Sequence, residues 1–122
     1  MEIITLDTNA VIDYFKGVSD VVKKIDGLRE KGVRFAVSVI VELELLSLPN
    51  LDSLDELQIL DWLTQIYVLP VDSAIARQAA EIRREMKIKT PDAIVAATAV
   101  FLGGKFISRD KKLQKIKGLK LI

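Results

Sequence analysis

Neither cysteine nor histidine occurs among the 122 residues of this sequence. The lack of cysteine excludes disulfide bonds, thiolate metal sites and cysteine nucleophiles, and it is typical of a reducing compartment. The lack of histidine excludes a Ser-His-Asp triad, ribonuclease chemistry based on paired imidazoles, and zinc bound by imidazole. Any catalysis must therefore use carboxylates, hydroxyls, lysine, arginine, tyrosine, or a metal ion held by oxygen atoms.

Long apolar runs are also missing. The longest nearly apolar stretch covers ten residues, 93–102, and includes Thr98. A membrane-spanning helix needs about 20 such residues. The first residues carry no basic region of the kind that opens a signal peptide. We therefore expect a cytoplasmic protein without a membrane segment.

What is present is the composition of one globular domain, which we expect to span residues 1–122. Half of the residues are hydrophobic and 29% are charged, with a net charge of +1. The charge is unevenly spread, because residues 105–120 hold seven basic residues and one acid, whereas the rest holds eleven basic and sixteen acidic residues. This basic segment is either a solvated surface or a contact for a phosphate backbone, and the sequence leaves both readings open.

Short apolar stretches alternate with segments of helical spacing. The predicted strands cover residues 3–6, 33–37, 67–69, 105–108 and 119–122. The predicted helices begin after Asp7 and then span about 18–31, 38–47, 53–66, 72–86 and 91–102. This alternation predicts the α/β class, with a parallel sheet of four to five strands and helices on both faces.

Two helices carry more detailed predictions. In the helix at 53–66, the apolar spacing rests on a row of leucines, Leu54, Leu57, Leu60 and Leu63. The last helix is predicted to start with Thr90 as a capping hydroxyl, Pro91 in the first helical position and Asp92 in the first turn. Its alanines favour either close packing on a neighbour or simply helix formation.

Acidic residues follow several of the predicted strands. Asp7 ends the first strand, Asp110 follows the fourth, and Asp92 opens the last helix. The helix after the second strand carries Glu42 and Glu44, which lie about 200° apart around the helix axis, so that only one can face a cleft. Sites in open parallel sheets form beyond the carboxyl ends of the strands. Each acid also has an ordinary explanation as a helix cap, a partner of the helix dipole or a solvent-facing residue.

Carboxylates gathered at one sheet edge would raise one another's pKa or recruit a cation. Without histidine or cysteine, they are hard oxygen ligands that favour Mg²⁺ or Mn²⁺ over zinc. Such a site can activate water and stabilise the leaving oxygen of a phosphodiester. The composition therefore permits metal-dependent phosphodiester hydrolysis.

Four segments, in order along the chain, resemble the motifs of the PIN-domain family and, within it, the small VapC-like toxins. They are Leu6–Asn9, Ser38–Leu46, Pro91–Ala99 and Phe106–Asp110. The resemblance implies a three-layer α/β/α sandwich with a central parallel sheet. It also implies an endoribonuclease that depends on Mg²⁺ or Mn²⁺.

The resemblance assigns roles residue by residue. It implies catalytic and metal-binding roles for four acids, Asp7, Glu44, Asp92 and Asp110. Glu44 is preferred to Glu42 because the family's acid comes six residues after the serine, just before a leucine. It places three polar residues, Thr8, Asn9 and Ser108, near the metal or the phosphate of RNA. For hydrolysis at such a site, Arg109 or a nearby lysine is the candidate that contacts the substrate and offsets the charge of the transferring phosphate.

The resemblance further implies partners. VapC-like toxins are neutralised by a small antitoxin whose C-terminal segment enters the acidic cleft, and they commonly form homodimers. Tyr14, Phe15 and the helix near 51–63 are candidate surfaces, although core packing is the ordinary explanation for apolar residues there.

The alternative function is a catalytically inactive PIN-like module that binds RNA or a protein, and metal binding would discriminate the two. A haloacid-dehalogenase-type phosphatase is disfavoured because Asn9 stands where its second acid does proton transfer. A receiver domain is disfavoured because no acid pair follows the first strand.

Overall fold

Five short strands form a single sheet in the computed structural model, which describes residues 2–122. The strands are β1 (Ile3–Leu6), β2 (Arg34–Ser38), β3 (Tyr67–Leu69), β4 (Lys105–Ile107) and β5 (Lys120–Leu121). Their order is β3-β2-β1-β4-β5, and every neighbouring pair is parallel. The predicted α/β class, with a parallel sheet of four to five strands, is confirmed.

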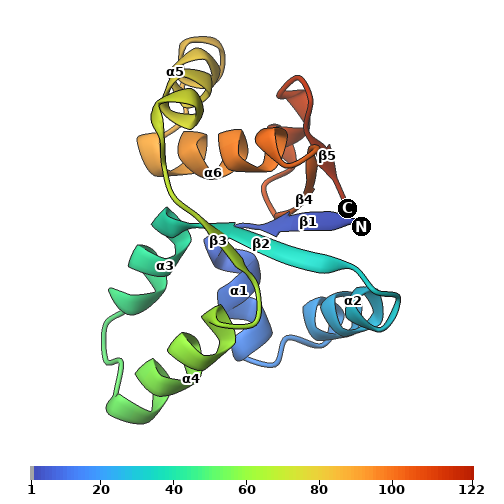
Figure 1. Ribbon diagram of the computed structural model, residues 1–122, viewed down its shortest axis with the longest axis vertical. Coiled ribbons are helices and arrows are strands. Elements are labelled where there is room, and N and C mark those ends of the chain that lie inside the picture. Colours follow the sequence, from blue (N-terminus) through green and yellow to red (C-terminus); the bar gives the residue numbers. More distant parts are fainter. Residues whose placement is uncertain (1) are drawn as a thin grey trace.

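Helices cover both faces of this sheet, as Figure 1 shows. One face carries α1 (Thr8–Phe15), α2 (Ser19–Glu30), α3 (Val39–Leu46) and α4 (Ser53–Leu63). The other carries α5 (Ser73–Met86) and α6 (Thr90–Phe101), and a short 3₁₀ helix, η1 (Lys111–Lys115), links β4 to β5. Since both faces are covered, the central strands read as continuous apolar runs. Among residues 2–122, no helix has the length and apolar character to span a bilayer.

The direction of chain progression reverses at the middle of the sheet. From β1 the chain adds β2 and then β3 on one side, whereas β4 pairs with the opposite side of β1. The register aligns Leu6 with Ile107, and the amide of Asp7 donates to the carbonyl of Ile107 at 3.3 Å. The carboxyl ends of β1 and β4 are therefore adjacent, which is where open α/β sheets form crevices for ligands.

The close packing of α6 fixes one wall of this crevice. Its alanines Ala93, Ala96, Ala97 and Ala99 are fully buried. Small side chains let the helix lie close to the sheet and to α5. The start of α6, and Asp92 with it, is thereby held at the carboxyl edge of the sheet.

The predicted start of α6 is wrong in one detail. Thr90 is already helical, and the capping position belongs to Lys89, whose side chain makes no capping hydrogen bond. Pro91 occupies the second helical position, where a side-chain cap would otherwise find an N–H donor. Because proline has no N–H, the helix start has less need of a hydroxyl cap.

Of the four leucines in the row along α4, only Leu63 belongs to the face that the helix buries. The residues that α4 buries are Ile59, Trp62 and Leu63. Leu54, Leu57 and Leu60 are exposed instead. Helical spacing identified the helix correctly, but two apolar stripes run along it, and spacing alone cannot say which of them packs on the core.

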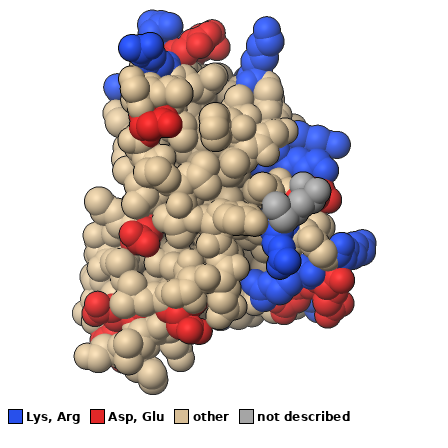
Figure 2. Space-filling view, viewed as in Figure 1, with Lys and Arg blue, Asp and Glu red and all other residues tan. Residues whose placement is uncertain are grey.

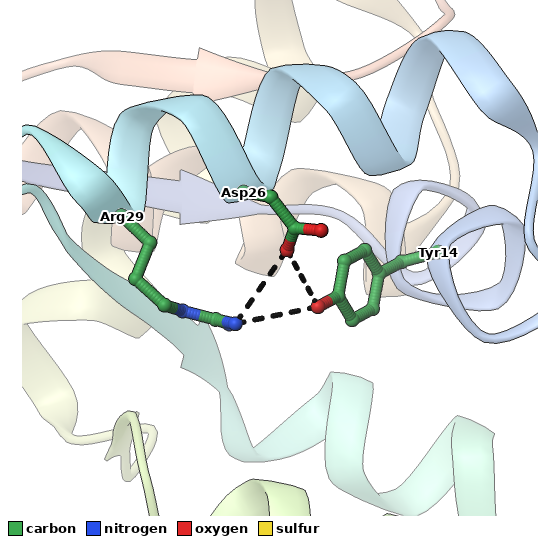
Figure 3. Close-up of polar contacts among 3 residues, drawn as sticks. All are labelled: Tyr14, Asp26 and Arg29. Carbon is green, nitrogen blue, oxygen red and sulfur yellow. Dashed lines mark hydrogen bonds and ion pairs between the residues drawn. The ribbon is translucent and has the colours of Figure 1, made fainter.

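A polar cluster ties α1 to α2 (Figure 3). The hydroxyl of Tyr14 donates to Oδ1 of Asp26 at 2.9 Å, and Arg29 donates to the same hydroxyl at 3.3 Å. The guanidinium of Arg29 also lies 6.0 Å from the ring centre of Phe35 in β2, within cation–π range. Tyr14 is therefore engaged within the fold, whereas its neighbour Phe15 is exposed.

One glycine provides a test of the packing at the amino edge. Gly104 has a φ of +94°, and a Cβ there would overlap the carbonyl oxygen of Gly118. Gly104→Ala should therefore lower the free energy of unfolding by about 2 kcal/mol or more. Gly27 lies inside α2 with open space around its Cα, so that Gly27→Ala should raise stability by about 0.5–1 kcal/mol. Urea unfolding of both variants measures the contrast, and equal stabilities would contradict it.

Candidate metal-dependent active site

A cleft of about 460 Å³ opens at the carboxyl edge of the sheet. Four acids line it, Asp7, Glu44, Asp92 and Asp110. The polar residues Thr8, Asn9 and Ser108 line it as well. Glu42 and Arg109 are not part of its lining. The fold therefore gathers seven of the eight predicted site residues into one concavity.

Asp7 lies between β1 and α1, where it serves as a helix cap. Its backbone is extended, and its Oδ1 accepts a hydrogen bond of 2.7 Å from the amide of Ala10. The carboxylate is also hydrogen-bonded by the side chain of Ser108, which follows β4. The capping role and the place in the cleft are thus compatible, because one carboxylate serves both.

Glu44 reaches the cleft from α3. Its Oε1 accepts a hydrogen bond of 2.6 Å from the hydroxyl of Thr8 in α1. Glu42 lies in the first turn of the same helix and outside the cleft. Of the two glutamates that the spacing left open, the geometry thus turns Glu44 toward the other acids.

The remaining two acids come from α6 and from the segment after β4. Asp92 lies in the first turn of α6. Asp110 caps η1 by accepting a hydrogen bond of 3.1 Å from the amide of Lys112, and its own amide donates to Oγ of Ser108 at 3.1 Å. Ser108 therefore links Asp110 to Asp7, and the four acids rest on four different elements.

Burial and mutual repulsion disfavour ionisation in the cleft. Burial is the main cause that raises the pKa of Asp7 above its ordinary value, and hydrogen bonds from Ser108 and Ala10 and the charge of Arg109 oppose the rise. Burial also raises the pKa of Asp92, followed by the charges of Glu44 and Asp110. A bound cation would relieve this repulsion.

The chemistry of the donor set fits a hard divalent cation. All four charged groups are carboxylates, which Mg²⁺ and Mn²⁺ prefer and which seldom suffice for zinc. Within residues 2–122, however, no three acidic side chains already converge closely enough to hold an ion. Side-chain rotation would have to bring their oxygens to the distance of about 2.1 Å that Mg²⁺ requires.

The basic segment divides between the two edges of the sheet. Lys105 pairs with Glu2 at the amino edge, and Lys120 lies beside Lys105 in the sheet. The lysines of η1, in contrast, directly follow Asp110. In Figure 2, Lys and Arg side chains gather on the right near both termini with some Asp and Glu among them, and further Asp and Glu side chains lie along the left side. The segment is thus not one continuous surface beside the acids.

Residues 4–119 match the PIN domain. The chain belongs to the PIN-domain family. This match spans nearly all of the described residues, and it agrees with the five-stranded parallel sheet and its helical layers. No curated protein sequence matches the chain.

Several solved structures are similar to this PIN domain, and among them are toxin–antitoxin complexes. A chain of a toxin–antitoxin complex from Klebsiella pneumoniae is 27% identical, with a TM-score of 0.79 over 96% of this chain and 95% of that one. A chain of DNA-bound VapBC from Salmonella typhimurium is 22% identical, with a TM-score of 0.78 over 100% and 98%. A chain of FitAcB from Neisseria gonorrhoeae is 24% identical, with a TM-score of 0.72 over 98% and 96%.

Arg109 is the one predicted site residue that does not line the cleft. It lies beside the cleft, where its Nε is 3.1 Å from Oδ2 of the buried Asp13. Asp13 was not among the residues that the sequence singled out. An acid among the apolar residues of α1 is unusual, and this signal could have drawn attention to Asp13. The sequence spacing could not identify its partner, which lies 96 residues away.

The raised pKa of Asp7 predicts that its ionised carboxylate lowers the stability of the folded chain. A carboxyl that is harder to ionise in the folded chain binds more protons there than in the unfolded chain, so ionisation costs stability once the pH exceeds the ordinary value of about 4. With a chelator present, Asp7→Asn should therefore raise Tm at pH 7, and the gain should shrink as the pH falls toward 4. Asparagine retains the capping oxygen.

The matched control is Glu81→Gln on the exposed surface of α5, which should leave the pH dependence of Tm unchanged. Thermal unfolding followed by circular dichroism between pH 4 and pH 8 supplies the measurement. A lower Tm for Asp7→Asn at pH 7 would contradict the predicted cost of ionising this carboxylate.

Proposed function

We propose that this PIN-domain protein is an endoribonuclease that hydrolyses RNA phosphodiester bonds with Mg²⁺ or Mn²⁺. The observation that carries the proposal is the meeting of Asp7, Glu44, Asp92 and Asp110 in one cleft. These acids come from four elements, and their mutual repulsion disfavours a purely structural reason for gathering them. Hydrolysis by metal-bound water needs neither of the two residue types that the sequence lacks.

The residues of the cleft have distinct tasks in this proposal. The four acids would hold the metal, which supplies an activated water and neutralises the phosphate charge. The hydroxyl of Thr8 keeps the Glu44 carboxylate in place, and Ser108 does the same for Asp7. Asn9 lines the cleft and offers an amide to the phosphate or ribose. In-line hydrolysis with departure of the 3′ oxygen leaves a 5′-phosphate and a 3′-hydroxyl.

An inactive PIN module that binds RNA or protein is the alternative. It would have no use for carboxylates that repel one another in a cleft, because burial and neighbouring negative charge disfavour the ionised forms of Asp7 and Asp92. Calorimetry separates the two functions, since the nuclease must bind Mn²⁺ or Mg²⁺ at the cleft and the inactive module need not.

The proposed partners are an antitoxin and a second copy of the chain. An RNA target would place the activity in the cytoplasm. Support for partners comes from the exposed leucines of α4, Leu54, Leu57 and Leu60. A different face of α4 lines a groove of about 190 Å³ between α1, α3 and α4, which includes Phe15 and Leu51. A row of exposed leucines along one helix is typical of a surface that contacts another protein.

RNA cleavage tests the catalytic proposal. The purified chain should cleave a labelled pool of single-stranded and transfer RNA with Mn²⁺ or Mg²⁺, and a chelator should abolish the cleavage. Glu44→Gln should lower the rate at least about 100-fold, because it removes a charge from the metal site. Glu42→Gln is the matched control on the same helix, and it should retain the rate of the unsubstituted chain.

Three results would contradict the catalytic proposal. They are cleavage that persists in chelator, equal rates for both glutamine variants, and an absence of metal binding by calorimetry. Thermal unfolding of each variant verifies that a lost rate reflects the site and not the fold.

The α4 surface makes a separate prediction about self-association. Sedimentation equilibrium should show a dimer for the unsubstituted chain and a shift toward monomer for Leu57→Asp, because the charge would be buried in the contact. Phe101→Asp is a control of equal exposure, since both side chains belong to residues that are 63% exposed and Phe101 lies on the opposite helical layer. A monomeric unsubstituted chain, or a dimer that survives Leu57→Asp, would refute a dimer through α4.

A further inference from the structure

An ion pair between a buried carboxylate and a largely exposed guanidinium joins α1 to the segment that follows β4. Oδ2 of Asp13 lies 3.1 Å from Nε of Arg109, and the exposed fractions of the two side chains are 9% and 67%. A carboxylate that is this buried needs a partner, because an unpaired buried charge is strongly destabilising. Among residues 2–122, Arg109 is the side chain that forms an ion pair with Asp13.

The pair uses only one side of the guanidinium. Asp13 engages Nε, and most of the Arg109 side chain remains exposed. A guanidinium presents five N–H donors in a rigid planar fork, and its two terminal nitrogens match the oxygens of a phosphate. The contact with Asp13 therefore fixes the plane of the fork and leaves its outer edge open to a second anion.

Arg109 lies on the flank of the acidic cleft. Its chain neighbours Ser108 and Asp110 both line that cleft. Arg109 itself lines an adjoining hollow of about 100 Å³, which shares Ser108 with the cleft and includes Asp13 and Asp20. A cation is thus placed next to, and not among, the carboxylates.

We propose that Asp13 is a positioning residue that fixes Arg109 on the flank of the cleft, where its guanidinium binds an RNA phosphate next to the one that is cleaved. The proposal rests on the proposed nuclease function. Carboxylates repel phosphates, so that a substrate with a phosphate at each nucleotide needs fixed cations beside the acids. Arg109 supplies one, and Asp13 keeps it from swinging into solvent.

A double-mutant cycle tests the proposal by steady-state cleavage of a short RNA. Arg109→Gln should raise KM about tenfold and change kcat by less than about twofold, since the contact binds ground state and transition state alike. Asp13→Asn should raise KM by a similar factor, because the asparagine no longer holds the guanidinium by charge. The double variant should be no worse than Arg109→Gln alone, because Asp13 acts through Arg109.

Two further variants serve as controls. Asp20→Asn removes an exposed acid from the same hollow, away from the recorded ion pair, and it should leave KM unchanged. Arg109→Lys keeps the charge but loses Nε and the planar fork, so it should raise KM nearly as much as Arg109→Gln. Because Arg109 is largely exposed, this variant is expected to fold even if Asp13→Asn does not.

The outcomes separate the two proposals. If the unsubstituted chain cleaves RNA but Asp13→Asn or Arg109→Lys keeps its KM, the positioning role is refuted and the nuclease stands. Independent, multiplying effects of Asp13→Asn and Arg109→Gln also refute it, since they would indicate a merely structural Asp13. If the unsubstituted chain neither cleaves RNA nor binds metal, the nuclease proposal fails, and the positioning role fails with it.

Discussion

The parallel pairing of β1 with β4 is the constraint on which the rest of this structure depends. Because β2 occupies the other side of β1, this pairing creates the point where chain progression reverses. It aligns Leu6 with Ile107, and the next residues of both strands, Asp7 and Ser108, therefore emerge side by side. Glu44 and Asp92 are then added from α3 and α6, the helices that pack next to this edge. The site is a consequence of topology, which explains how four distant segments of the chain can form it.

Such a gathering has an electrostatic cost that the fold only partly offsets. Burial raises the pKa of Asp7 and of Asp92, and each lies near further negative charge. Neutral donors compensate where they can, since Thr8 donates to Glu44 and Ser108 bonds Asp7. Hydroxyls stabilise carboxylates without neutralising them, so the cleft keeps its affinity for a cation. Function that lowers stability in this way is common at active sites.

The sequence predicted the strands and their parallel arrangement, because short apolar runs that alternate with helices are a local signal of this architecture. It predicted acids at one edge because the carboxyl ends of parallel strands meet at the same edge of a sheet. It could not tell which stripe of α4 packs inward, since Ile59 and Leu57 are equally apolar and only tertiary contacts decide. It misplaced the N-cap of α6 by one residue. A capping hydroxyl was expected at Thr90, but the cap is Lys89, and the spacing of apolar residues does not distinguish these two positions. It missed Asp13 altogether, because an ion pair across 96 residues requires the folded chain.

Two of the acids also show that structural and chemical roles need not compete. Asp7 caps α1 with one oxygen, and Asp110 caps η1 in the same manner. A capping carboxylate is held by backbone amides, so its orientation is fixed before any ligand arrives, and its second oxygen remains available. Substitution by asparagine keeps the cap and removes the charge. At Asp7 and Asp110, an asparagine variant therefore tests the charge of the carboxylate while the helix cap is kept, whereas an alanine variant would remove the cap and the charge together.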